Sequence, residues 1–149
     1  MLTIHTAPLL RTRWESGPPV PEGAVVVSGD RIEAVGGLEE LTARYPSARV
    51  RCWPGTLGPA LVHEGPLPDA PSPRERVYAV MRTGAAAVVA RHVTDPALRD
   101  AARRSGVRVV DEAVVPALAP GARADLTVLG DAGECLATVL AGRVLHRRR

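Results

Sequence analysis

Two segments with the pattern of a β-hairpin lie near opposite ends of the 149-residue chain, and this arrangement constrains the fold more than any other feature of the sequence. The first covers residues 24–36: a β-branched run, a turn at Gly29, and a run that alternates polar and apolar residues. The second covers residues 135–146 and turns at Gly142. The sequence therefore predicts antiparallel β-structure at both ends of the chain.

The segments around these hairpins predict further short elements. Residues 2–10 have the pattern of a strand that leads into a loop, and a helix is expected over residues 38–45. Residues 16–23 are so rich in glycine and proline that no regular element is expected there. Two more strands are expected over residues 50–53 and 125–129.

The middle of the chain has a different pattern, in which strands and helices alternate. An apolar strand is expected over residues 57–62, a second over 85–90 and a third over 107–110. Ser72 and Asp95, each followed by a proline, are suited to cap the two helices between them. This order predicts a small βαβ unit with parallel strands.

Composition limits the classes of protein that the chain can belong to. The length fits one compact domain, or one domain with a small insert, and 46% hydrophobic residues are enough for a packed core. No apolar run has the roughly 18 residues of a membrane helix, and the first residues lack the layout of a secretory signal. We therefore expect a soluble cytoplasmic protein that does not bind membranes.

The basic character of the chain is a weak guide to its partners. All 19 basic residues are arginine, and lysine, asparagine, glutamine and phenylalanine are absent. The absence of lysine, asparagine and phenylalanine is typical of a high-GC bacterial coding bias. The formal net charge is only +3, and none of the four aromatic residues lies inside an arginine cluster. Because nucleic-acid binding usually needs a basic stripe with aromatic side chains, we expect no nucleic-acid partner.

Both ends of the chain resemble the flanking segments of the amidohydrolase superfamily, in particular its imidazolonepropionase and aminodeoxyfutalosine-deaminase type. The resemblance lies in residues 23–36, 118–129 and 137–145. It implies an α+β fold in which residues 1–58 and 115–149 form a discontinuous β-sandwich, the composite domain of these metal-dependent hydrolases. Since a complete (β/α)8 barrel takes about 250 residues, residues 59–114 can form only a small βαβ insert in its place.

The same resemblance bears on the catalytic residues. Family members carry a proline-glycine pair, a short strand and then His-x-His as the first metal ligands. Residues 59–67 match this stretch, and the ligand positions fall on Gly65 and Leu67, which cannot bind a metal. The expected function is therefore that of a pseudoenzyme, a non-catalytic relative of the carbon–nitrogen hydrolases that acts in binding or assembly. A decayed gene product that folds without a selected function is a further alternative.

An alternative site can be built from the residues that follow the three middle strands: His63, Glu64, His92, Asp111 and Glu112. If these strands are adjacent and parallel, their carboxyl ends meet at one edge, where ligands of α/β proteins gather. Imidazole and carboxylate groups suit zinc or another divalent ion, so a small metal-dependent hydrolase or a small-ligand binder is the rival function. The simpler interpretation is that His92 hydrogen-bonds locally, the glutamates are solvated and Asp111 ends a strand.

The remaining nucleophiles carry no recognisable motif. Cys52 and Cys135 are too few for a disulfide framework, and we expect both to be small buried residues, with contact between them left open. Ser28, Ser72 and Ser105 lie outside any Gly-x-Ser-x-Gly elbow.

Loss of most barrel strands predicts a partner. Unpaired strand edges associate with other chains unless they are blocked, and the apolar run 85–89 must be covered by helices of the same chain or by another subunit. We expect a homo-oligomer, most simply a homodimer, or a complex with a partner protein, with the βαβ unit near the contact.

Overall fold

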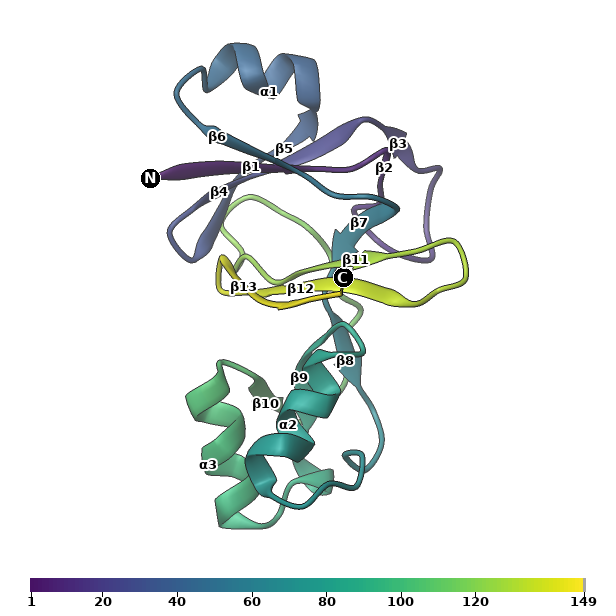
Figure 1. Ribbon diagram of the computed structural model, residues 1–149, viewed down its shortest axis with the longest axis vertical. Helices are drawn as coiled ribbons and strands as arrows, with labels where there is room; N and C mark the ends of the chain where they lie inside the picture. The colour runs from purple at the N-terminus through teal and green to yellow at the C-terminus, as the bar shows by residue number, and fades with distance from the viewer. Residues whose placement is uncertain (149) are drawn as a thin grey trace.

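The computed structural model describes residues 1–148 and shows a mixed α+β architecture dominated by three sheets (Figure 1). The four-stranded sheet has the order β5-β4-β1-β6 and consists of β1 (Leu2–Thr6), β4 (Gly23–Ser28), β5 (Arg31–Gly37) and β6 (Arg49–Cys52). The six-stranded sheet has the order β13-β12-β11-β7-β2-β3 and consists of β2 (Leu9–Leu10), β3 (Val20–Pro21), β7 (Thr56–Pro59), β11 (Leu126–Leu129), β12 (Cys135–Leu140) and β13 (Arg143–Arg147).

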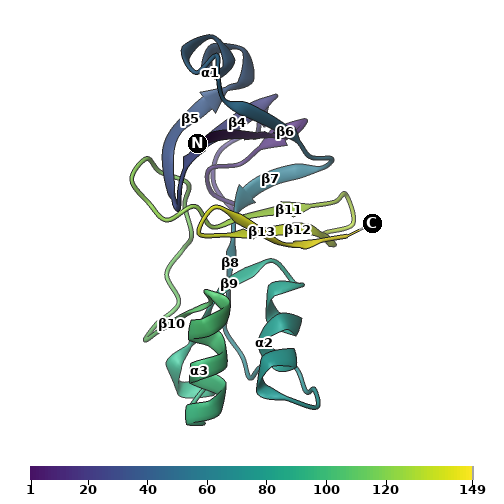
Figure 2. The same ribbon diagram turned by 60° about the vertical axis from the view of Figure 1, so that its left-hand side comes forward.

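The third sheet has three parallel strands and carries two of the helices. Its order is β10-β9-β8, with β8 (Leu61–His63), β9 (Ala85–Val89) and β10 (Arg108–Val110). Helices α2 (Pro73–Met81) and α3 (Pro96–Ser105) connect these strands, and a 3-10 turn (Ala90–His92) follows β9. Figure 2 shows the two helices side by side against this small sheet. The predicted parallel βαβ pattern is confirmed.

Strand β4 shows why the first hairpin is placed as it is. Val25 and Val27 point into the core that the four-stranded and six-stranded sheets share, together with Leu57 and Leu126 from the second sheet. The alternate residue Val26 packs on the opposite face, beneath helix α1 (Leu38–Arg44). Because α1 covers the outer face (Figure 1), the strand is buried on both sides, which accounts for its unbroken β-branched run.

Backbone hydrogen bonds join the two ends of the chain. The Ile32 amide donates to the Ala122 carbonyl over 2.9 Å, and the Ala124 amide donates to the Asp30 carbonyl over 2.8 Å. The turn of the second hairpin also lies against the turn of the first, since a Cβ atom on Gly142 would collide with the carbonyl oxygen of Gly29. Both hairpins predicted from the sequence are confirmed by their antiparallel registers.

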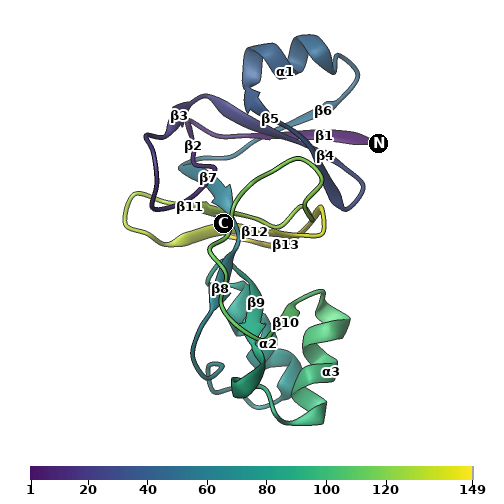
Figure 3. The ribbon, with the colours of Figure 1, turned by 180° about the vertical axis from the view of Figure 1, so that it is seen from behind.

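One predicted strand is wrong, because residues 57–62 belong to two sheets. Strand β7 ends at Pro59 and pairs with β11, whereas β8 begins at Leu61 and pairs with β9 (Figure 3). At the change of sheet, the Ala60 amide donates to the Asp125 carbonyl and the Leu61 amide donates to the Gly84 carbonyl. A continuous apolar run gives no sign of such a change of partner.

The turn-rich segment 16–23 was expected to hold no regular element, and this is also wrong. Val20 and Pro21 form the two-residue strand β3, which pairs with Leu9 and Leu10 at the edge of the six-stranded sheet. An edge strand tolerates proline because only one side of it needs backbone donors.

Both central helices begin at the predicted caps. The Ser72 hydroxyl accepts a hydrogen bond from the Glu75 amide, and the Asp95 carboxylate accepts one from the Ala97 amide. Helix α3 ends at Gly106, whose φ of 83° lies in the left-handed region that favours glycine. Among residues 1–148, none of the helices combines the length and the hydropathy that a membrane crossing requires.

The apolar run of β9 is covered within the chain itself. Its residues are at most 2% exposed, and Ala86 and Val88 pack in a core with α2, α3 and Leu140 of β12. The two outer strands of this sheet, β8 and β10, have a neighbour on one side only among the described residues.

Candidate functional site

The structure brings together the strand ends that carry the candidate residues. Because β8, β9 and β10 are adjacent and parallel, their carboxyl ends lie at one edge of the small sheet. His63 is the last residue of β8, His92 ends the 3-10 turn after β9, and Asp111 follows β10. The geometric condition for the proposed ligand set is therefore met at the level of the backbone.

The side chains themselves do not form a ligand set. Within residues 1–148, no three His, Cys, Asp or Glu side chains lie close enough together to hold a metal ion. His63 Nε2 lies 2.9 Å from the carbonyl oxygen of Pro66, to which it can donate. Glu64, Asp111 and Glu112 are exposed, and His92 is partly buried. A role for these five residues in binding another ligand stays a prediction.

The two positions that the resemblance assigns to the first metal ligands lie in the loop after β8. Gly65 is partly buried and has no side chain. Leu67 is only 4% exposed and packs in the hydrophobic core with residues of α2 and α3, including Val77 and Leu98. The chain thus uses the second of these positions for packing rather than for coordination.

A groove rich in arginine, which the sequence did not indicate, runs along β10. It has a volume of about 530 Å³ and is lined by β10 itself, by Arg99 and Arg103 of α3, and by Arg123. Arg99 and Arg103 are four residues apart and so share one face of the helix. The spacing of Arg99 and Arg103, followed by Arg108 on a short strand, could have indicated the groove in the sequence. Because arginine is abundant throughout the chain, this pattern does not stand out.

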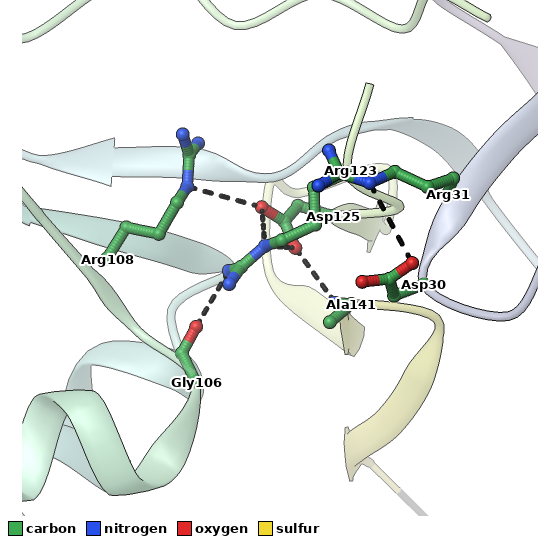
Figure 4. Close-up of polar contacts among 7 residues, drawn as sticks. All are labelled: Asp30, Arg31, Gly106, Arg108, Arg123, Asp125 and Ala141. Atoms are coloured by element: carbon green, nitrogen blue, oxygen red, sulfur yellow. Dashed lines mark hydrogen bonds and ion pairs between the residues drawn. The ribbon is translucent and has the colours of Figure 1, made fainter. Parts of the chain in front are cut away.

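Asp125 connects this groove to the rest of the molecule (Figure 4). Its side chain is 8% exposed, and Arg123 Nε donates to both carboxylate oxygens over 2.8 Å. Arg123 also donates through Nη2 to the carbonyl oxygen of Gly106, at the end of α3. The Ala141 amide donates to Asp125 Oδ1 over 2.9 Å, and Arg108 Nε lies 3.6 Å from Oδ2. Asp125 therefore contacts the second hairpin and Arg108 of β10 directly, and it is linked to the end of α3 through Arg123.

A second groove, of about 490 Å³, lies between α2 and the β12–β13 hairpin and includes Cys135 and His146. Burial, and then the positive charges of Arg82 and Arg148, lower the pKa of His146, while a hydrogen bond with the Cys135 backbone acts in the opposite direction. Cys135 is partly buried and its thiol is free. The sulfur lies 3.3 Å from Thr138 Oγ1.

The expectation that both cysteines are buried is wrong for Cys52. This residue is exposed on β6, an outer strand that within residues 1–148 pairs with β1 alone, and its thiol is free. The serines have local roles: Ser72 caps α2, and the Ser105 hydroxyl donates to the Ala101 carbonyl. Ser28 is exposed at the end of β4.

His5 is the one strongly perturbed titratable group among the described residues outside these grooves. It is 2% exposed, and its Nδ1 accepts a hydrogen bond from Trp53 Nε1 over 3.0 Å. Burial, and then the charge of Arg51, lower the pKa of His5 from 6.5 to about 4. His5 belongs to β1, and its hydrogen bond with the Trp53 ring indicates a structural role.

The four-stranded and six-stranded sheets together use segments from both ends of the chain, and the small parallel α/β unit follows β7 and precedes β11 in the sequence. The family model described as the bacterial imidazolonepropionase-like composite domain matches residues 23–48, which span β4, β5 and α1. The resemblance identified from the sequence is thus confirmed. A search of curated proteins found no significant match.

Solved structures with a similar fold include three deaminases. Aminofutalosine deaminase from Helicobacter pylori shares 18% identity with a TM-score of 0.56, over 74% of this chain and 33% of that chain. An adenosine deaminase from Xanthomonas campestris with bound zinc shares 16% identity with a TM-score of 0.51, over 72% of this chain and 32% of that chain. Guanine deaminase from Escherichia coli shares 15% identity with a TM-score of 0.50, over 70% and 34%. The chain spans about a third of the length of these proteins.

Proposed function

We propose that this chain is a non-catalytic relative of the carbon–nitrogen amidohydrolases that acts through binding or assembly. The observation that supports this most strongly is the environment of Leu67. The resemblance assigns a metal-binding histidine to this position, but the side chain is 4% exposed in an apolar core. A histidine there would have to bury an imidazole where leucine now fills the space, so the local packing opposes a metal site.

The proposal includes the organisation of the domain. Residues 1–58 and 115–149 would form the composite β-sandwich, and residues 59–114 the shortened α/β insert. The core shared by Val25, Leu57 and Leu126, which come from both of these segments, supports this division. We also propose that the protein is cytoplasmic. We propose further that it forms a homo-oligomer or a complex with a partner protein, since β8 and β10 each leave one edge unpaired among the described residues.

The test is metal analysis together with an activity assay. The chain is purified without a histidine tag, its metals are measured by mass spectrometry, and hydrolysis of amides, cyclic imides and aminopurines is followed with and without added zinc. We expect neither stoichiometric metal nor zinc-dependent turnover. Turnover that requires added metal would overturn the proposal.

The rival is a small metal-dependent hydrolase or ligand binder that uses His63, Glu64, His92, Asp111 and Glu112. The adjacency of the three parallel strands supports it, because the five residues end or follow these strands in the sequence. A stoichiometric ion that is lost in His92→Ala and kept in His146→Ala would support this function. His146 lies on β13, in the other groove, so its substitution is a suitable control.

A further inference from the structure

The outer edge of β10 is an unpaired strand edge within the described residues. Arg108, Val109 and Val110 pair with Ala87, Val88 and Val89 of β9 on one side. No backbone group of these three residues hydrogen-bonds to any other segment of residues 1–148. The groove described above follows this edge, because residues 106–111 line it. A second extended chain could therefore add to the sheet here through its backbone.

The charge of the groove is positive and largely uncompensated. Arg99 is exposed, and its hydrogen bonds go to the neutral carbonyls of Val93 and Ala90. Arg103 is exposed, and its side chain has no hydrogen bond or ion pair with any described residue. Arg108 is 54% exposed and reaches Asp125 only at 3.6 Å. Of the arginines that line the groove, Arg123 is the one that pairs closely with a carboxylate, that of Asp125. Asp111 lies at the end of the groove, and the positive charges of the lining exceed its single negative charge.

We propose that the edge of β10 binds an extended acidic segment of a partner protein, which adds to the small sheet as a fourth strand. This inference rests on the proposed function and specifies its binding partner. In an added strand, alternate side chains face the same side, so carboxylates at every second position would meet Arg99 and Arg103 on α3. The backbone supplies affinity, and the arginines select for acidic residues.

Two other occupants fit the groove less well. A second copy of this chain that paired its own β10 with this edge about a two-fold axis would bring the same arginines toward the groove, and its net charge of +3 would add to the repulsion. A nucleic acid would be held by its phosphates, but no aromatic side chain lines the groove to stack a base. An acidic peptide is complementary to both the strand edge and the charge.

The probe is a fluorescent peptide of alternating glutamate and valine, and its binding to the full chain is measured by fluorescence anisotropy. Arg103→Glu is the test variant, because it reverses a groove charge without removing a contact within the chain. Arg74→Glu is the matched control, since Arg74 is exposed on α2, outside the groove, and its side chain has no hydrogen bond or ion pair with any described residue. Circular dichroism establishes that both variants fold.

We expect the glutamate peptide to bind the chain and the matching lysine peptide not to bind it. Arg103→Glu should weaken the affinity for the glutamate peptide about tenfold, whereas Arg74→Glu should change it less than about twofold. A glutamate peptide whose alternate backbone amides are methylated should also fail, because it cannot complete the strand ladder. Undiminished binding of the methylated peptide would overturn strand addition. An equal effect of both substitutions, self-association abolished by Arg103→Glu, or preference for an oligonucleotide would overturn the acidic partner.

The outcome is independent of the metal and activity assays. Zinc-dependent turnover would overturn the non-catalytic function even if the peptide binds. Absence of peptide binding without turnover would overturn only this inference.

Discussion

The buried histidine of β1 makes the stability of the fold depend on pH in a calculable way. Trp53 Nε1 can only donate, so the His5 Nδ1 that accepts its hydrogen bond must be unprotonated. Burial and the nearby Arg51 lower the pKa of His5 to about 4 in the folded chain, against 6.5 for an ordinary histidine. Between these two values the unfolded chain binds the proton and the folded chain does not. The free energy of unfolding therefore falls as the pH drops from 6.5 toward 4.

The size of this effect follows from the difference between the two pKa values. At about 1.4 kcal/mol per pH unit, His5 accounts for a loss of about 3 kcal/mol by pH 4. The assay is urea denaturation at several pH values, for the original chain and for His5→Asn, whose side-chain oxygen can accept the Trp53 hydrogen bond without titrating. Carboxylate effects are common to both chains, so the difference between them isolates His5. Parallel curves between pH 7 and 4 would refute this assignment.

Two further substitutions test how the chain ends are held together. Asp125→Asn leaves the Arg123 guanidinium without its partner charge and should lower the free energy of unfolding, measured by urea denaturation, by about 3 kcal/mol. Asp100→Asn removes one partner of an exposed ion pair and should lower it by less than about 0.5 kcal/mol. Equal losses would contradict the role of Asp125. Gly142→Ala should lower the melting temperature more than Gly133→Ala, since both have a positive φ but only Gly142 lies against Gly29, and the clash adds about 1–3 kcal/mol. Similar shifts in scanning calorimetry would indicate that the two hairpin turns are not in contact.

The elements that could be predicted from the sequence are those set by local chemistry. Ser72 and Asp95 predict where their helices begin, because a cap accepts hydrogen bonds from amides two or three residues away. The two hairpins could also be predicted from the sequence, since Gly29 and Gly142 both have the positive φ that their turns require. These local signals were sufficient to place both hairpins and both central helices.

The features that could not be predicted depend on contacts between distant residues. The change of sheet at Ala60 is set by hydrogen bonds to Asp125 and Gly84, which lie far away in the sequence. The candidate site shows the same limit: strand order placed His63 and His92 at one edge, but their side-chain directions depend on loop packing. The groove beside β10 requires Arg123 to approach α3 from a separate segment, and nothing in the local sequence encodes that approach.

The central proposal is that this chain has a composite domain like that of the amidohydrolases and binds a partner without hydrolysing a substrate. Its most direct test is the rate of carbon–nitrogen bond hydrolysis by the folded chain saturated with zinc, measured against the same substrates with zinc alone. We predict that the two rates are equal across the substrate panel. A higher rate with the chain, abolished by a chelator and restored by the metal, would contradict the claim.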